Sequence, residues 1–131
     1  MVGLKIEHVA ICTNSEEESD KFFIELLGCE KTRSFTVSTE LMKAFFGTNS
    51  DQPVVRYEKD GVNFEIFIMN DKSEAKDIYT HSCILVPDRD DLIARANELN
   101  YQTIQVPRKN NDSYYLFIKD SYGNLFEVKD L

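Results

Sequence analysis

Two histidines and two glutamates recur in the same order in the two halves of this sequence: His8, Glu65, His81 and Glu127. Each glutamate lies in a copy of the same pattern, Gly-x-x-Phe-Glu followed by Ile or Val, at residues 61–66 and 123–128. Repetition of a motif in the same order indicates an internal duplication. Two neutral imidazoles and two carboxylates balance the charge of one divalent cation, and such a mixed set favours Ni, Co, Mn, Fe(II) or Zn.

Packing is the alternative explanation for each of these residues alone. A single histidine on a strand is more often a satisfied core residue than a ligand, but recurrence of the whole set in register favours a metal site. Glu65 adds to this, because the predicted strand 62–70 is apolar on both faces. A buried carboxylate without a partner costs several kcal/mol, so Glu65 needs a cation or a proton.

The elements that position these residues repeat as well. Alternating apolar residues predict strands over 4–13, 62–70, 80–86 and 125–129, which carry the four candidate ligands. Ser15 and Asp88 are typical helix N-caps, and Asp60-Gly61 is typical of a two-residue hairpin turn. Each half is thus predicted to be β-α-β-β-β. The fold class is α+β, with two tandem βαβββ modules that form a cleft of mixed β-sheet.

The same pattern gives the domain organisation. The 131 residues fit one domain, with a first module over about 4–70, a linker over about 71–77 and a second module over about 78–131. The segment 40–52 has no clear period and is expected to form a loop or a short helix over the mouth of the site.

Composition excludes several classes of partner. A net charge of −8 argues against nucleic acid and anionic membranes, and no apolar run is long enough to span a bilayer. The N-terminus lacks a signal-peptide pattern, so a cytoplasmic protein is expected. Cys12, Cys29 and Cys83 have no metal-binding spacing and are expected to be reduced. Cys12 and Cys83 are expected to line the cavity near His8 and His81, as small core residues rather than nucleophiles.

The C-terminal segment identifies a family resemblance. Asp120, Gly123, Asn124 and Glu127 form an Asp-x-x-Gly-Asn-x-x-Glu ending that, with the two histidine strands, resembles the vicinal oxygen chelate superfamily across essentially the whole chain. That fold hosts glyoxalase I, methylmalonyl-CoA epimerase, extradiol dioxygenases, thiol transferases that inactivate fosfomycin and metal-free antibiotic-binding proteins.

The set of candidate ligands is similar to that of bacterial glyoxalase I, lactoylglutathione lyase. The resemblance implies one divalent metal ion (Ni, Co, Zn, Mn or Fe) on His8, Glu65, His81 and Glu127. It implies a lyase or isomerase that acts on a small substrate with vicinal oxygens, through a metal-stabilised enediolate and proton transfer by Glu127 or Glu65, with Glu127 favoured as the base. It also implies a homodimer, with the four ligands from one chain or shared across two.

Two positions depart from the glyoxalase I pattern. Cys12 and Met69 stand where that family has the Arg and Asn that bind glutathione, so glutathione is not the expected substrate. The alternative function is a non-catalytic small-molecule or metal-binding protein of the same fold, of the resistance or sequestration type. A third hypothesis, a dioxygenase, requires oxygen uptake with Fe(II).

Overall fold

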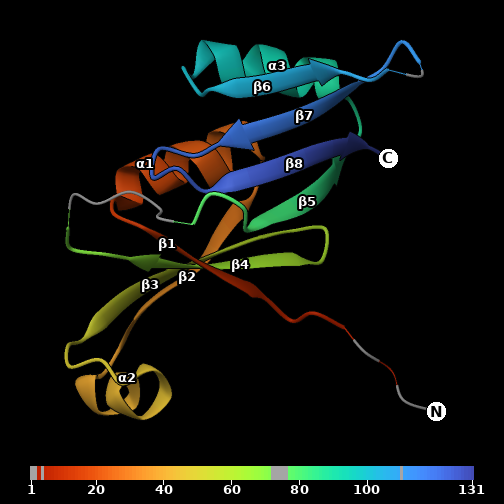
Figure 1. Cartoon of the computed structure of the whole chain (residues 1–131). Helices are drawn as coiled ribbons and strands as arrows, with labels where there is room; N and C mark the ends of the chain where they lie inside the picture. Colours follow the sequence, from red (N-terminus) through yellow and green to blue (C-terminus); the bar gives the residue numbers. More distant parts are fainter. Residues whose placement is uncertain (1–2, 4, 72–76, 110) are drawn as a thin grey trace. The chain divides into compact units, whose positions relative to one another are not determined.

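The computed structural model describes residues 3, 5–71, 77–109 and 111–131 (Figure 1). The chain divides into two compact units, Met1–Ser73 and Glu74–Leu131. Each unit contains one four-stranded mixed sheet. Most of the predicted linker, residues 72–76, lies outside the described residues.

The first unit is built on the sheet order β1-β4-β3-β2. β1 runs parallel to β4, and the other neighbours are antiparallel. Its elements are β1 (Val9–Thr13), α1 (Glu16–Asp20), η1 (Lys21–Leu26), β2 (Glu30–Val37), α2 (Thr39–Phe46), β3 (Gln52–Lys59) and β4 (Val62–Ile68).

One face of this sheet carries the core of the unit. The Oγ of Ser15 accepts a hydrogen bond from the backbone N–H of Glu18 at 3.2 Å and so begins α1, which continues without a break as the π-helical turn η1. The ring of Phe23, fully buried, stacks on Tyr57 of β3 with 5.0 Å between centroids. The helix predicted after the Ser15 cap is therefore present, and its buried face contributes to the core.

The turn between β3 and β4 sets the register of the sheet. Asp60 and Gly61 both have positive φ, 51° and 81°, the backbone that a two-residue type I′ hairpin requires. The turn brings Arg56 opposite Glu65. The hairpin prediction from Asp60-Gly61 is confirmed.

The second unit repeats the plan with the order β5-β8-β7-β6, again with a parallel first pair. Its elements are β5 (His81–Val86), α3 (Arg89–Glu98), β6 (Thr103–Pro107), β7 (Tyr114–Lys119) and β8 (Leu125–Asp130). Asp88 caps α3, which lies along β6 in Figure 1 and contacts β6 and β8. The predicted fold of two βαβββ modules is confirmed, with α2 as an addition to the first.

One boundary differs from the sequence-based prediction, and the segment 40–52 takes the short helix that was one of its two expected states. The first strand begins at Val9 rather than at residue 4, which leaves His8 just before it. The side-chain amide of Asn63 donates to the backbone carbonyl of Glu7 at 2.8 Å, and that bond takes the place of a further ladder bond. The segment 40–52 contains a true helix, α2, which begins after Ser38 and ends at Gly47 with φ 72°.

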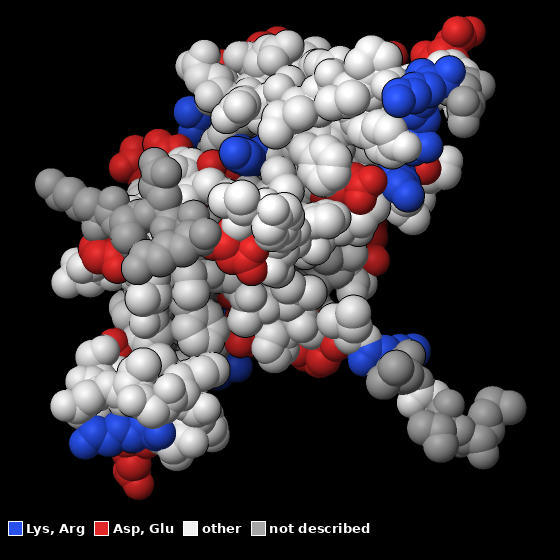
Figure 2. Space-filling view, viewed as in Figure 1, with Lys and Arg blue, Asp and Glu red and all other residues white. Residues whose placement is uncertain are grey.

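The charged surface is scattered rather than concentrated. Figure 2 shows Lys and Arg side chains in small separate groups on the visible face, interspersed with Asp and Glu. Among the described residues, no helix is both long enough and apolar enough to cross a membrane.

The Asp-x-x-Gly-Asn segment has a structural role in the turn between β7 and β8. The carboxylate of Asp120 accepts hydrogen bonds from the backbone N–H groups of Tyr122 and Asn124, at 3.0 and 2.9 Å, and from the Asn124 side-chain amide at 2.8 Å. Gly123 has φ 98°, which favours glycine. Burial raises the pKa of Asp120, while the bonds from Asn124, Tyr122 and Gly123 oppose the shift.

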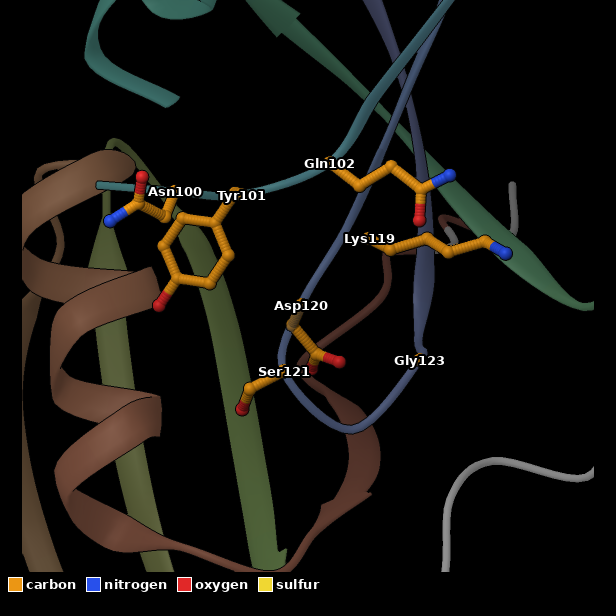
Figure 3. Close-up of a pocket in the computed structure, with 7 residues that line it drawn as sticks. All are labelled: Asn100, Tyr101, Gln102, Lys119, Asp120, Ser121 and Gly123. Atoms are coloured by element: carbon orange, nitrogen blue, oxygen red, sulfur yellow. The ribbon is translucent and has the colours of Figure 1, made fainter. Parts of the chain in front are cut away.

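A polar cavity of about 320 Å³ lies beside this turn, and Figure 3 shows the carboxylate of Asp120 inside the turn. Because three donors already occupy that carboxylate, the cavity offers no free anionic ligand there. It is lined by residues 100–102, 119–121 and 123.

Replacement of Asp120 by Ala should destabilise the protein, because three hydrogen bonds to one buried carboxylate are lost. We expect the free energy of unfolding to fall by about 2–3 kcal/mol, measured by urea denaturation. The matched control is Asp112→Ala, which removes an exposed carboxylate from the loop between β6 and β7 and should change it by less than about 0.5 kcal/mol. Equal effects would contradict a structural role for Asp120.

Candidate functional site

The two glutamates occupy equivalent positions in the two sheets. In the parallel pair β1–β4, Glu65 lies opposite Ala10, and in β5–β8, Glu127 lies opposite Cys83. In each unit the histidine, His8 or His81, stands two residues before that partner. Side chains two residues apart on an extended chain share a face, so each histidine is on the same side of its sheet as its glutamate.

Each histidine lies next to the glutamate of its own unit. His8 Nδ1 is 3.7 Å from Glu65 Oε2, and His81 Nε2 is 3.5 Å from Glu127 Oε2. The glutamate side chains are largely covered, with 16% and 19% of their surface exposed, while the histidines are 40% and 35% exposed. Two of the predicted associations are therefore present, one per unit. Convergence of the two pairs stays a prediction.

The ring of His81 is held in an orientation suited to a ligand. Its Nδ1 lies 2.8 Å from the backbone carbonyl of Tyr79, which can only accept, so Nδ1 carries the proton. In the neutral ring the lone pair is then on Nε2, the atom that faces Glu127. Metal-binding histidines ordinarily donate their other N–H in this way. The edge of the ring also packs on Phe117, with 5.6 Å between centroids.

His8 is held by a carboxylate instead. Its Nδ1 contacts the carboxylate of Glu7, which in turn accepts from Arg56 Nη2 at 2.6 Å. The hydrogen bond from Arg56, followed by that from His8, holds the pKa of Glu7 below its usual value, so Glu7 is an acceptor and His8 Nδ1 is the donor. The His8 nitrogen nearest Glu65 is this same Nδ1, at 3.7 Å, whereas in His81 it is Nε2 that faces Glu127. In the neutral ring of His8 the lone pair is on Nε2. Sequence reasoning treated Glu7 only as part of a polar lead-in and missed this role.

The donor set fits a divalent cation. Two ligands about 2.1 Å from one ion stand roughly 3.0–3.4 Å apart, close to the 3.5 Å between His81 Nε2 and Glu127 Oε2. Two acceptor atoms that face each other at this distance need a proton or a cation between them. Within the described residues, no three His, Cys, Asp or Glu side chains come close enough together to hold a metal ion. Each unit thus supplies two donors.

Arg56 is a second residue, with Glu7, that sequence reasoning did not place at the site. Its guanidinium lies 3.4 Å from Glu65 and 3.5 Å from Glu58, in addition to its bond with Glu7. Glu65 was expected to need a cation or a proton, and Arg56 supplies a cation. The signal was present, because residues paired across the 60–61 turn have numbers that add to 121, as 56 and 65 do.

An apolar row borders the charged residues of the first unit. Phe67, two residues after Glu65 on the same face of β4, meets the ring of Phe46 edge-on with 5.7 Å between centroids. Phe45 and Phe46 are 64% and 58% exposed. In Figure 2 the surface at the position of α2 is largely uncharged. The helix that was expected near the site thus packs an aromatic ring against Phe67, which stands two residues after Glu65 on the same face of β4.

The cysteines Cys12 and Cys83 differ from their prediction as core residues. Both are exposed, because they lie on the face that carries the histidines rather than on the buried face. Partial burial raises the pKa of both thiols, with further contributions from Asp71 at Cys12 and from Glu127 at Cys83. A raised pKa lowers the thiolate fraction, which agrees with the expectation that neither is an activated nucleophile.

Solved structures with the same fold include two glyoxalase family proteins. The protein from Enterococcus faecalis is 22% identical, with a TM-score of 0.71 and 95% of each chain covered. The protein from Bacillus cereus is 15% identical, with a TM-score of 0.75 and 99% of this chain and 95% of that chain covered.

A third similar structure is a mutant of the fosfomycin resistance protein FosX from Listeria monocytogenes, in complex with Mn(II) and 1S,2S-dihydroxypropylphosphonic acid. It is 14% identical, with a TM-score of 0.71 and coverage of 98% of this chain and 90% of that chain. A comparison with curated proteins found no match. At these identities the likeness shows the fold alone.

A family model matches nearly the whole chain. The match covers residues 5–128 and so includes both histidines, both glutamates and the Asp120 turn. The resemblance inferred from the C-terminal signature is thereby confirmed. The chain belongs to the Glyoxalase/Bleomycin resistance protein/Dioxygenase superfamily.

Proposed function

We propose that this protein is a divalent-metal-dependent lyase or isomerase of glyoxalase type, which acts on a small substrate with oxygens on adjacent carbons. The observation that carries the proposal is the duplicated His–Glu pair, in which an acceptor on Nδ1 of each histidine places the lone pair of the neutral ring on Nε2. A packing role does not require the same tautomer to be held twice.

In this proposal His8, Glu65, His81 and Glu127 hold the metal, which is Ni, Co, Mn, Fe or Zn. A bound divalent ion would supply Lewis-acid polarisation of the substrate oxygens. A carboxylate of the chain, Glu127 or Glu65, takes a proton from one substrate carbon and returns it to the adjacent carbon. Their low exposure, 19% and 16%, limits competition from water.

The comparisons support the class of substrate and cofactor. The FosX structure holds Mn(II) together with a compound whose two hydroxyl groups are on adjacent carbons. A substrate with vicinal oxygens is the corresponding proposal for this chain. The aromatic rings of Phe46 and Phe67 suit a substrate with an apolar part beside those oxygens.

The alternative is a non-catalytic small-molecule or metal-binding protein of the same fold. One observation favours it: Arg56 already compensates the charge of Glu65, so the first pair is satisfied without a metal. The two functions differ in turnover rather than in binding.

Metal content separates a metal site from a packing role. Protein purified without chelator or affinity nickel should contain about one divalent ion per chain, measured by mass spectrometry of the elements. His81→Ala and His8→Ala should each lose the ion, because each removes a nitrogen ligand. Asp112→Ala is the control and should keep it.

The pattern of loss also tests the arrangement. Loss of the whole ion from either histidine variant supports one ion that needs both pairs. Two ions in the wild type, with one lost from each variant, would mean one site per unit. No ion even after reconstitution with Ni, Co, Mn, Fe and Zn would contradict the proposed function and favour a protein that binds without chemistry.

Turnover should follow metal loading. A panel of 2-oxoaldehyde hemithioacetals made with several thiols, and of acyl-CoA epimers, should include a substrate for the loaded protein. Loss of the carboxylate base, Glu127→Gln or Glu65→Gln, should lower kcat by about 10²–10⁴, with the fold intact by circular dichroism. A loaded protein that turns over no member of the panel would support the alternative function.

A homodimer is part of the same proposal, with the site formed within one chain or shared between two. Sedimentation analysis at micromolar concentration should give about twice the 15.2 kDa mass of the chain. Mixing His8→Ala with His81→Ala protein should restore up to one site per dimer if ligands are shared across chains. A purely monomeric protein would exclude sharing.

A further inference from the structure

The two glutamates face different residues across their sheets, although their positions are equivalent. Each glutamate also faces a residue on the neighbouring antiparallel strand. Arg56 of β3 lies opposite Glu65, and Phe117 of β7 lies opposite Glu127. The duplicated site is therefore symmetric in its histidines and glutamates and asymmetric in the residue next to each carboxylate.

This asymmetry changes the electrostatics of the two carboxylates. Glu65 has a guanidinium nitrogen 3.4 Å from Oε2, the same oxygen that faces His8. In the described part of the chain, the ion pairs of Glu127 include only His81. Phe117 offers Glu127 a ring instead of a charge.

A metal ion therefore gains less from Glu65 than from Glu127. To bind Glu65, the ion must displace or approach a cation that already compensates this carboxylate, and like charges at such distances repel. To bind Glu127, the ion meets a largely covered carboxylate whose ion pairs within the described residues are with His81 alone, through a ring that is neutral in the tautomer described above. A covered carboxylate without a guanidinium beside it gains more from a bound cation.

Building on the proposed function, we propose that Arg56 is a positioning residue that holds Glu65 away from the metal. The ion is then bound by His8, His81 and Glu127, and Glu65 is the carboxylate that moves the proton. Two histidines and one carboxylate leave coordination positions for the two substrate oxygens. This inference narrows the four-residue ligand set of the proposed function to three, and it differs from the sequence-based preference for Glu127 as the base.

The proton transfer is balanced without another reactant. Glu65 accepts a proton as a substrate C–H bond breaks, and the electron pair of that bond stays on the substrate. The Glu65 O–H bond then breaks as a C–H bond forms at the adjacent carbon, which restores the carboxylate. No oxidant or reductant is consumed.

Arg56 also contacts Glu7, the carboxylate that orients His8, so its two roles must be separated. A variant of Arg56 alone changes both. Arg56→Gln is therefore made both in the wild type and in Glu65→Gln. The change in metal affinity that it causes only in the wild type is the part that acts through Glu65.

The test is the affinity of chelator-treated protein for Ni²⁺, measured by isothermal titration calorimetry. Glu65→Gln should change the dissociation constant by less than about threefold, and Glu127→Gln should raise it about 100-fold, as expected for removal of a ligand rather than a neighbour. Arg56→Gln should lower the dissociation constant for Ni²⁺ in the wild-type background. This decrease should be about tenfold larger than the change that the same substitution causes in the Glu65→Gln background. Arg56→Lys, which keeps the charge, should stay within about threefold of wild type.

Arg33→Gln is the matched control, because Arg33 lies opposite Arg56 on β2, one strand further from Glu65. Its effect on the dissociation constant should be the same in both backgrounds. A loss of affinity in Glu65→Gln as large as that in Glu127→Gln would overturn the inference while leaving the proposed metal site in place. Equal effects of Arg56→Gln in both backgrounds would also overturn it. A wild-type protein that binds none of Ni²⁺, Co²⁺, Mn²⁺, Fe²⁺ and Zn²⁺ would overturn the proposed function and this inference together.

Discussion

The parallel pairing of the first and last strands in each unit is the constraint on which the site depends. Because side chains alternate along a strand, a slip of one residue would move Glu65 or Glu127 to the opposite face of its sheet. The buried faces prevent such a slip, since Ile66 in β4 and Val128 in β8 are fully covered. The core of each unit therefore determines that its histidine and glutamate meet.

Electrostatics then decides what each pair does. A largely covered carboxylate requires a positive partner, and the two units meet this requirement differently. In the first, Arg56 lies among Glu7, Glu58 and Glu65, three carboxylates around one guanidinium. In the second, the backbone carbonyl of Tyr79 fixes the His81 ring so that its free nitrogen faces Glu127. Surplus carboxylate charge in the first unit, and a lone pair on His81 Nε2 beside Glu127 in the second, each suit a cation from solution.

The strength of the sequence signals explains how much of this could be predicted. The Asp60-Gly61 turn and the Ser15 cap are local signals, because a few adjacent residues determine the backbone there, and both predictions are confirmed. The repeat of His and Glu predicted which side chains would meet within each unit. The fold followed from that repeat and from the family resemblance.

Predictions that depended on the surroundings of a residue were weaker. His8 precedes its strand because the side chain of Asn63 bonds to the Glu7 carbonyl, a contact across 56 residues that periodicity does not contain. Cys12 and Cys83 were assigned to the core from their small size, although the face that they share with the histidines is the exposed one. The partner of Glu65 was within reach of the sequence, because the register that follows from a two-residue turn pairs residue 56 with residue 65.

A duplicated site can change its chemistry without any change in its apparent ligands. Counting residues gives two His–Glu pairs, one in each unit. The surroundings of the two carboxylates give a different result, because the guanidinium of Arg56 lies 3.4 Å from Glu65, whereas Phe117 lies opposite Glu127. The residue across the antiparallel strand from each glutamate thus carries information that the ligand motif lacks. Members of one fold can differ in which coordination positions of a metal remain open. The residue opposite each glutamate is therefore as informative about function as the ligands themselves.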